Sequence, residues 1–373
     1  MNTSILRLSA VLLLLAGPLA ACGASDSPDN DGGADEGSST GGADDAMSDD
    51  SSDGATDPNA TSADDDGSTG GESTEPGTGS SGEEVEDTTP PTVVSSIPAS
   101  GETGVFADVI MTIEFSEPMD TASVETAYYS ADLPDPAVAM NWNDAGDQLI
   151  ITPLSELPYG SGVSALDITP QAIALSVTTA ATDLAGNELE QDFDLEFTML
   201  NLIREEIGLL GSMSGSIRAD GLAQFGMIRA GDAGNPPNAR YRGIASFPID
   251  DLSPDIAEFV DATLLSTQYE TAGSPYTDLG ELELHQVAFD SISAAFETPS
   301  EGLLGVLADS GANGQHALHV TAAVQASYDA GADMTQFAYQ FPLATDFDGT
   351  ADYAEFHATN EPATLLRVDY LVP

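Results

Sequence analysis

The sequence predicts an all-β protein with two antiparallel β-sandwiches that follow a long acidic segment. From residue 91 onward, short apolar segments alternate with polar residues at the two-residue period of a strand. Turns rich in Gly and Pro separate these segments, and no long helical pattern occurs among them. The length of 373 residues allows two or three domains at about 150 residues each.

The charge and cysteine content exclude several classes of protein. The chain has 63 acidic residues against 7 basic ones, all arginine, and a formal net charge of −56. Nucleic acid is therefore excluded as a partner, because its phosphates need Lys and Arg contacts. The single cysteine excludes an intramolecular disulfide framework, a cysteine-rich zinc site and a CxxC redox pair.

Residues 1–21 have the pattern of a secretory signal peptide. Arg7 supplies the positive charge, and an apolar run that contains Leu12–Leu15 follows it. Residues Leu19–Cys22 resemble the bacterial lipobox, which implies cleavage before Cys22 and lipidation of that residue. The alternative is an ordinary secreted protein. Gly23, rather than Asp, follows the cysteine, and by analogy with Gram-negative sorting we expect anchoring in the outer membrane through the lipid.

Residues 22–90 are predicted to form a disordered linker after the lipidated Cys22. Residues 23–90 hold 20 acidic residues, 13 Gly, 12 Ser and 8 Thr, with no basic residue. Such a segment cannot bury enough apolar surface to offset the entropy of ordering it. We therefore expect a flexible tether between the membrane and the folded part.

Residues 91–200 are predicted to form the first sandwich, of about seven strands. Met111, Ile113 and Phe115 alternate with polar residues, and Phe193–Phe197 repeats this pattern as a closing strand. Residues Thr92–Gly101, Glu114–Asp120, Leu149–Pro153 and the Asp183–Asn187 turn, in that order, resemble the SbsA-type bacterial Ig-like domain. The resemblance implies an Ig-like antiparallel β-sandwich that serves as an extracellular spacer.

Asp183 and Asn187 have two interpretations. In the first, Asp183 bonds nearby backbone N–H groups and Asn187 accepts the left-handed backbone of a turn. In the second, the two side chains are Ca²⁺ ligands together with carbonyl oxygens.

Residues 205–373 are predicted to form a larger, jelly-roll-like β-sandwich. Strands are expected near 241–249, 260–271, 279–289, 335–342 and 364–372, with one short helix at 322–328 that stops at Gly331. Residues Arg242–Ile249, His319–Gln325 and Glu361–Tyr370 resemble the DNRLRE-type sandwich, which is related to carbohydrate-binding modules. The resemblance implies surface attachment or glycan binding.

The candidate ligand-binding residues of this second sandwich are Arg240, Tyr241 and Arg242. The two arginines alternate with the tyrosine, so both are expected on one face of a strand, where they would bind an acidic glycan. The alternative is that they neutralise neighbouring carboxylates. Further aromatic candidates for stacking on sugar rings are Tyr269, Tyr276, Tyr339 and Tyr353.

Asp346, Asp348 and Asp352 resemble the first half of a calcium loop. An EF-hand is excluded because His357 stands where its twelfth position requires Glu. A simpler Ca²⁺ site in a β-loop, or a solvated hairpin turn, are the two remaining interpretations. Ca²⁺ is the one cofactor that the sequence suggests.

We expect a non-enzymatic function. The chain has no GxSxG, HExxH, P-loop or GxGxxG motif, and no catalytic residue is predicted. The leading hypothesis is a cell-surface lipoprotein in which an Ig-like spacer carries a sandwich that binds an extracellular polysaccharide or a surface protein. The alternatives are a purely structural envelope lipoprotein and a polysaccharide-degrading enzyme that uses two carboxylates.

Overall fold

The structure is a computed structural model that describes residues 86–373. The predicted signal peptide, Cys22 and all of the predicted linker up to residue 85 lie outside the described residues. Within residues 86–373, no helix is long and apolar enough to cross a membrane. The described part consists mainly of strands, which confirms the all-β prediction. We call residues 91–200 the N-terminal body and residues 201–373 the C-terminal body.

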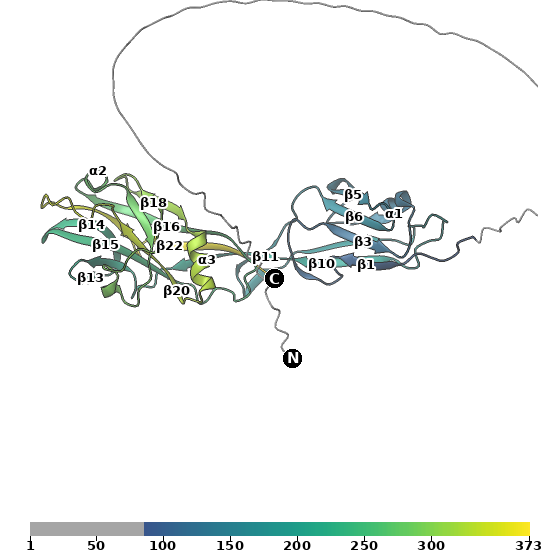
Figure 1. The fold of residues 1–373 in the computed structure, drawn as a ribbon, viewed down its shortest axis with the longest axis horizontal. Coiled ribbons are helices and arrows are strands. Elements are labelled where there is room, and N and C mark those ends of the chain that lie inside the picture. The colour runs from purple at the N-terminus through teal and green to yellow at the C-terminus, as the bar shows by residue number, and fades with distance from the viewer. Residues whose placement is uncertain (1–85) are drawn as a thin grey trace, which may run out of the picture. The chain divides into compact units, whose positions relative to one another are not determined.

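The N-terminal body contains two four-stranded sheets (Figure 1). The sheet orders are β1-β3-β6-β5 and β2-β10-β9-β4. The strands are β1 Val93–Ile97, β2 Thr103–Val105, β3 Met111–Phe115, β4 Tyr128–Tyr129, β5 Val138–Trp142, β6 Gln148–Pro153, β9 Ala172–Val177 and β10 Phe193–Met199. A short helix, α1 (Thr121–Ala127), and a 3₁₀ turn, η1 (Asp135–Ala137), connect them.

The core of the N-terminal body follows from strand alternation. Met111, Ile113 and Phe115 are buried along β3, as the sequence predicts. Along β10, Leu195 and Phe197 are buried while the intervening acids are exposed. Because every acidic residue of these strands lies on an outer face or at a turn, the interior stays apolar without ion pairs.

The C-terminal body is one continuous network of strands with a large hydrophobic core and a second, smaller cluster around Ile217, Ile244 and Phe289. Its main hydrogen-bonded order is β18-β17-β20-β15-β14-β21-β16-β22-β11. The strands are β11 Asn201–Gly208, β12 Gly215–Arg218, β13 Ala223–Gln224, β14 Met227–Gly234, β15 Pro237–Pro248, β16 Glu258–Ala272, β17 Leu282–Gln286, β18 Gly302–Ala308, β19 Gly314–His319, β20 Met334–Gln340, β21 Asp352–His357 and β22 Leu365–Val372. The helical elements are α2 Pro275–Asp278, η2 Ile292–Ala294 and α3 Thr321–Asp329.

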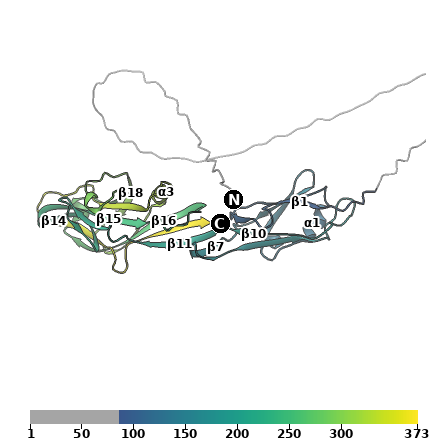
Figure 2. The ribbon, with the colours of Figure 1, turned by 90° about the horizontal axis from the view of Figure 1, so that it is seen from below.

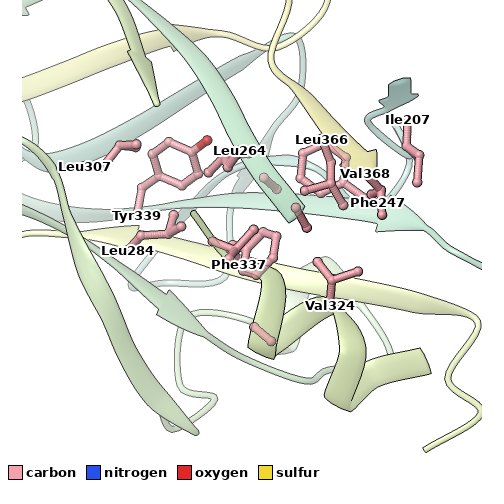
Figure 3. Packing of buried hydrophobic residues seen from close by; sticks show 14 of the residues in the cluster. Ile207, Phe247, Leu264, Leu284, Leu307, Val324, Phe337, Tyr339, Leu366 and Val368 are labelled. Carbon is pink, nitrogen blue, oxygen red and sulfur yellow. The ribbon is translucent and has the colours of Figure 1, made fainter. Parts of the chain in front are cut away.

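The core of the C-terminal body is built from aromatic and branched side chains of several strands (Figure 3). Phe247, Phe337 and Tyr339 come from β15 and β20, and none of them has measurable exposure. Complete burial of each large apolar side chain stabilises the fold by about 1.5–3 kcal/mol. Helix α3 covers this core with Val324 and stops before Gly331, whose φ of +67° is the left-handed conformation that ends helices.

A hairpin from the first 200 residues extends the sheet of the C-terminal body. Strand β7 (Gly160–Ser164) pairs with β11 in parallel, and β8 (Asp167–Thr169) pairs with β7 (Figure 2). Glycine is required in β7, because a Cβ at Gly160 would overlap the Asn201 side chain and one at Gly162 would overlap Ile203. Strand β11 is therefore hydrogen-bonded on both edges, to β7 and to β22.

Candidate functional site

The three candidate residues of β15 lie at the wall of one cavity. Arg240, Tyr241 and Arg242 line a pocket of about 330 Å³. The opposite wall comes from the segment that follows η2 and from the end of β20. The other residues that line it are Gly231, Phe296, Thr298, Ser300, Gln340, Phe341, Pro342 and Ala344. We call this cavity the arginine pocket.

Arg242 fixes the wall that faces β15. Its Nη1 donates to the carbonyl oxygens of Ala295 at 3.0 Å, Phe296 at 3.4 Å and Thr298 at 2.5 Å. The residue is only 7% exposed, and its Nε has no hydrogen-bond partner among the described residues. Burial lowers the pKa of the Arg242 guanidinium, which is nevertheless charged at neutral pH because arginine titrates so far above it.

Arg240 lies on the same side of β15, as the alternation of the two arginines predicts. Its guanidinium carbon is 5.3 Å from the centre of the Phe296 ring, a cation–π distance. Tyr241 is buried, and its ring is approached by Arg229 at 5.2 Å. The pocket thus combines two guanidinium groups with an aromatic surface.

The alternative interpretation, that these arginines neutralise neighbouring carboxylates, stays a prediction, and Arg240 lies directly opposite Asp232 in the β14–β15 ladder. Neither Arg240 nor Arg242 forms an ion pair with any carboxylate of residues 86–373. The four remaining arginines of this part do so, in the pairs Arg204–Asp369, Arg218–Asp220, Arg229–Glu355 and Arg367–Glu206. The reason is local: the carbonyl groups of Ala295, Phe296 and Thr298 accept from Nη1 of Arg242, and the Phe296 ring lies against Arg240.

Polar groups of a second layer support the pocket. Ser300, which lines it, shares a hydrogen bond of 2.9 Å with His285 Nδ1, and His285 Nε2 lies 2.8 Å from a carboxylate oxygen of Glu283. Because the acid holds one ring nitrogen, the other is directed at the serine hydroxyl. The hydroxyl groups of Ser300 and Thr298 and the amide of Gln340 are the neutral polar side chains of the lining.

The other candidate tyrosines do not line the arginine pocket. Tyr339 is fully buried in the core, and the Tyr276 hydroxyl donates to Gln268. Tyr353 stacks on Arg229 at 4.2 Å, and the Tyr269 hydroxyl donates to Glu355. Phe296, which does line it, was not predicted, because it lies in an irregular segment with no strand pattern.

Asp183 and Asn187 are joined to each other at the predicted turn. Asn187 donates to the Asp183 carboxylate from its backbone N–H at 2.8 Å and from its side-chain Nδ2 at 2.8 Å. Burial would raise the pKa of Asp183, but the hydrogen bonds from Asn187 and from the backbone of Ala185 and Gly186 outweigh it and lower that pKa. Asp87 and Glu117 lie near Asp183. The Asp183 oxygens already have donors, so this arrangement matches turn chemistry.

The predicted Asp346–Asp348–Asp352 set is only partly brought together. Asp346 and Asp352 lie with Asp278, with one carboxylate oxygen from each within 4.8 Å of the others. Asp348 is outside this group, because its carboxylate accepts the Thr350 backbone N–H at 2.6 Å and the Thr350 hydroxyl at 2.7 Å. Asp278 was missed because it lies about seventy positions away in the sequence and carries no local motif.

A larger cavity, of about 470 Å³, lies in the N-terminal body. Its charged lining residues are Asp132, Asp194 and Glu196, and it has no basic residue. Its surface is therefore negative, the opposite of the arginine pocket.

Comparison with known proteins identifies the first folded part. Residues 87–199 match the family model of the bacterial Ig-like domain. This confirms the Ig-like part of the resemblance. The resemblance of residues 205–373 to the DNRLRE-type sandwich stays a prediction, and a comparison with curated proteins gives no match.

Several solved structures show distant similarity. Domains 1–6 of the surface-layer protein SbsC match with 12% identity over 48% of this chain and 28% of that chain, at a TM-score of 0.21. An L,D-transpeptidase from Mycobacterium smegmatis matches with 18% identity over 43% of this chain and 76% of that chain, at a TM-score of 0.20. SGBP-B from a complex xyloglucan utilization locus in Bacteroides uniformis matches with 8% identity over 74% of this chain and 72% of that chain, at a TM-score of 0.20. The chain thus spans less than a third of the SbsC chain with domains 1–6, and at these TM-scores we draw no functional conclusion from the similarity.

Proposed function

We propose that the C-terminal body binds an acidic extracellular polysaccharide in the arginine pocket, without catalysis, while the Ig-like part serves as a spacer. One observation carries this proposal. In a chain with 63 acidic residues against 7 basic ones, the two arginines that pair with no described carboxylate line the same cavity. Paired guanidinium groups bind carboxylate and sulfate groups through directed, charge-assisted hydrogen bonds.

The rest of the lining supports a sugar as the carrier of that negative charge. Phe296 offers a partly exposed ring against which the apolar face of a sugar can pack. Thr298, Ser300 and Gln340 offer hydroxyl and amide groups for sugar hydroxyls. The volume of about 330 Å³ lies at the lower end of the range for small-ligand sites, about 300–1,000 Å³, and suits one or two sugar rings.

The negative net charge does not prevent this binding. At physiological ionic strength the Debye length is about 8 Å, so carboxylates farther away are largely screened. Direct contacts with Arg240 and Arg242 are screened much less. We therefore expect affinity to fall as salt rises, by an amount that reflects these two contacts.

We further propose that the protein is a lipoprotein anchored in the outer membrane through Cys22, with residues 23–90 as the tether. The support is the sequence of residues 1–22 alone. In the producing cells, Cys22→Ser should move the protein from the membrane fraction to the soluble fraction, and mass spectrometry of residue 22 in the wild type should find acyl chains. An unmodified Cys22 in membrane-associated protein would contradict the anchor.

The binding test uses the purified chain and immobilised polygalacturonate, with an uncharged glucan as reference. Wild-type protein should be retarded by the acidic polymer and not by the neutral one. Arg240→Gln and Phe296→Ala should each weaken binding at least tenfold. Arg367→Gln is the matched control, since it removes the same charge from an exposed arginine paired with Glu206.

Three outcomes would overturn the proposal. The first is no binding to polygalacturonate or to a sulfated polymer. The second is equal weakening by Arg240→Gln and Arg367→Gln, which would indicate nonspecific attraction. The third is release of reducing ends from the polymer, which would support the enzyme alternative.

A further inference from the structure

A group of carboxylates lies beside the arginine pocket, on three segments of the C-terminal body. Asp278 ends α2, Asp352 begins β21, and Asp346 lies in the loop before β21. One oxygen from each lies within 4.8 Å of the others. This spacing is compatible with one Ca²⁺ ion, because ligand oxygens at about 2.3–2.6 Å from the ion can be up to about 5 Å apart.

A fourth carboxylate next to this group has an oxygen with no partner. Asp232 of β14 is fully buried, and its Oδ2 accepts no hydrogen bond from the described residues. Its other oxygen, Oδ1, accepts the backbone N–H of Asp352 at 3.2 Å. Asp232 and Asp352 are directly opposite in the β14–β21 ladder, so their side chains project from the same face of the sheet. The unpartnered carboxylate is thus directed to the side of the sheet where the other acids gather.

These negative charges lie close together without a described basic side chain paired to any of them. Asp232 is fully buried, and the nearby carboxylates of Asp346 and Asp352 carry charge of the same sign. No described basic side chain forms an ion pair with any of the four acids. Arg240, which faces Asp232 across the β14–β15 ladder, has its guanidinium against Phe296. A buried charge without a counter-charge is costly unless a cation or proton offsets it.

The backbone of Gly273 and Ser274 lies very close to the Asp352 carboxylate. Gly273, at φ +66°, has no room for a Cβ, which would overlap Ala351 O and Asp352 Oδ1. The next N–H, that of Ser274, donates to Asp352 Oδ1 at 2.6 Å. The Thr350 hydroxyl lies 3.3 Å from Asp352 Oδ2 and adds a neutral oxygen. Asp352 is therefore held in one orientation, with lone pairs left for an ion.

We infer that Asp232, Asp278, Asp346 and Asp352 form a Ca²⁺ site that ties β14, the α2 turn and the 341–352 segment together. The set differs from the sequence motif, because Asp232 and Asp278 take part and Asp348 does not. Ca²⁺ fits better than Mg²⁺, since carboxylates from three separate segments suit a large, flexible oxygen sphere rather than a strict octahedron. Gly231 and Ala344 line the arginine pocket within two positions of Asp232 and Asp346, so the ion would also fix one wall of that pocket.

The test measures Ca²⁺ binding by calorimetry and Tm by far-UV circular dichroism, on the full chain after chelator treatment in 0.15 M NaCl. Saturating Ca²⁺ should raise the Tm of the wild type by roughly 5 °C. Asp278→Asn, an exposed position that should not disturb folding, should weaken the specific binding at least tenfold. Asp348→Asn is the matched control: it removes the same charge two residues from Asp346, from a carboxylate that is not a proposed ligand, and should weaken binding much less than Asp278→Asn does.

The Asp232→Asn variant distinguishes two roles for Asp232, that of a Ca²⁺ ligand and that of an acid that only supports the fold. Without Ca²⁺ it should match or exceed the Tm of the wild type, because it removes a buried repulsive charge, and with Ca²⁺ it should lose most of the Tm rise. The inference is overturned if Asp278→Asn and Asp232→Asn bind Ca²⁺ as the wild type does, or if Asp348→Asn weakens binding as much as Asp278→Asn. It is also overturned if NaCl at equal ionic strength gives the same rise in Tm.

Discussion

The two bodies of this protein are both acidic, but they differ in whether basic side chains accompany the carboxylates. Residues 92–200 contain 18 acidic residues and no Arg, Lys or His, whereas residues 201–373 contain 25 acidic residues together with 6 Arg and 4 His. All the ion pairs of the described residues lie in the C-terminal body. The N-terminal body places its carboxylates on outer faces and at turns, where water and salt screen them, except for the buried Asp183, which accepts hydrogen bonds from Asn187. The C-terminal body instead uses arginines, four of which form ion pairs with carboxylates while two line a pocket.

The largest expected effect comes from Arg242, because it holds three carbonyl groups of the pocket wall. Arg242→Met should destabilise the C-terminal body by about 3 kcal/mol, since the buried carbonyl oxygens lose their donor. Trp142 is the only tryptophan and lies in the N-terminal body, so its fluorescence reports that body alone. Urea unfolding should show a shifted far-UV circular dichroism transition and an unshifted Trp142 transition. Equal shifts in both would contradict separate behaviour of the two bodies.

Salt should act more strongly on the N-terminal body. Without cationic side chains, its carboxylates repel one another at low ionic strength, and NaCl screens this repulsion. Between 10 mM and 0.5 M NaCl we expect the Trp142 transition to move up by roughly 5 °C, and the remaining transition to move less. A Trp142 midpoint that is independent of salt would show that the carboxylates are too far apart to interact.

A smaller effect is expected from Tyr128 in the N-terminal body. Its hydroxyl donates to Leu133 O at 2.7 Å, and burial raises the pKa of this phenol to about 12. In the unfolded chain tyrosine titrates near 10, so the folded state holds the proton more tightly. The stability that this group contributes is therefore present below pH 10 and is lost as the pH rises from about 10 toward 12.

Tyr128→Phe should cost about 1 kcal/mol at neutral pH, through loss of one hydrogen bond. It should also make the alkaline decline of the Trp142 transition shallower. Tyr129→Phe, at a neighbouring residue that is 66% exposed, is the control. An identical pH profile for Tyr128→Phe and the wild type would show that the buried phenol does not cause the alkaline decline of the Trp142 transition.

The smallest effect concerns an exposed ion pair of the C-terminal body. Arg367 lies 2.8 Å from Glu206, with side chains 39% and 53% exposed. Arg367→Gln should change the free energy of unfolding by less than about 0.5 kcal/mol, because water and salt screen such pairs. A loss above that value, measured by urea unfolding, would show that this exposed pair contributes more than solvent-screened pairs usually do.

Some strands were predictable because their period is local, among them β15, β16, β17, β20 and β22 of the C-terminal body, whereas β11–β14, β18 and β21 were not predicted. The pattern of Met111, Ile113 and Phe115 places β3 and its buried face, and the helix that stops at Gly331 is recognisable from its last residues. Helix α1 was not predicted, since its seven residues are too few to show a period. Its start depends on Asp120, which accepts the Ala122 N–H at 3.2 Å.

The sites were predictable only where neighbours in sequence are neighbours in space. Arg240 and Arg242 share a face because they are two positions apart on a strand. Phe296 could not be assigned to their pocket, because an irregular segment brings it there. In the same way the DxD pattern suggested Asp348, which turns to Thr350 instead. Asp232 is placed opposite Asp352 by long-range strand pairing that no local motif records.

The pairing of β11 with β22 has a consequence for how the C-terminal body is made. These strands join residues that are far apart in sequence, such as Glu205 and Tyr370, which are 165 positions apart and hydrogen-bonded. Until β22 has been synthesised, the edge of β11 that faces it has no partner, and Ile203 and Ile207 lack their final packing. High contact order of this kind slows folding. An emerging chain would thus complete its Ig-like part early, while the C-terminal body stays open until late and requires protection from aggregation until then.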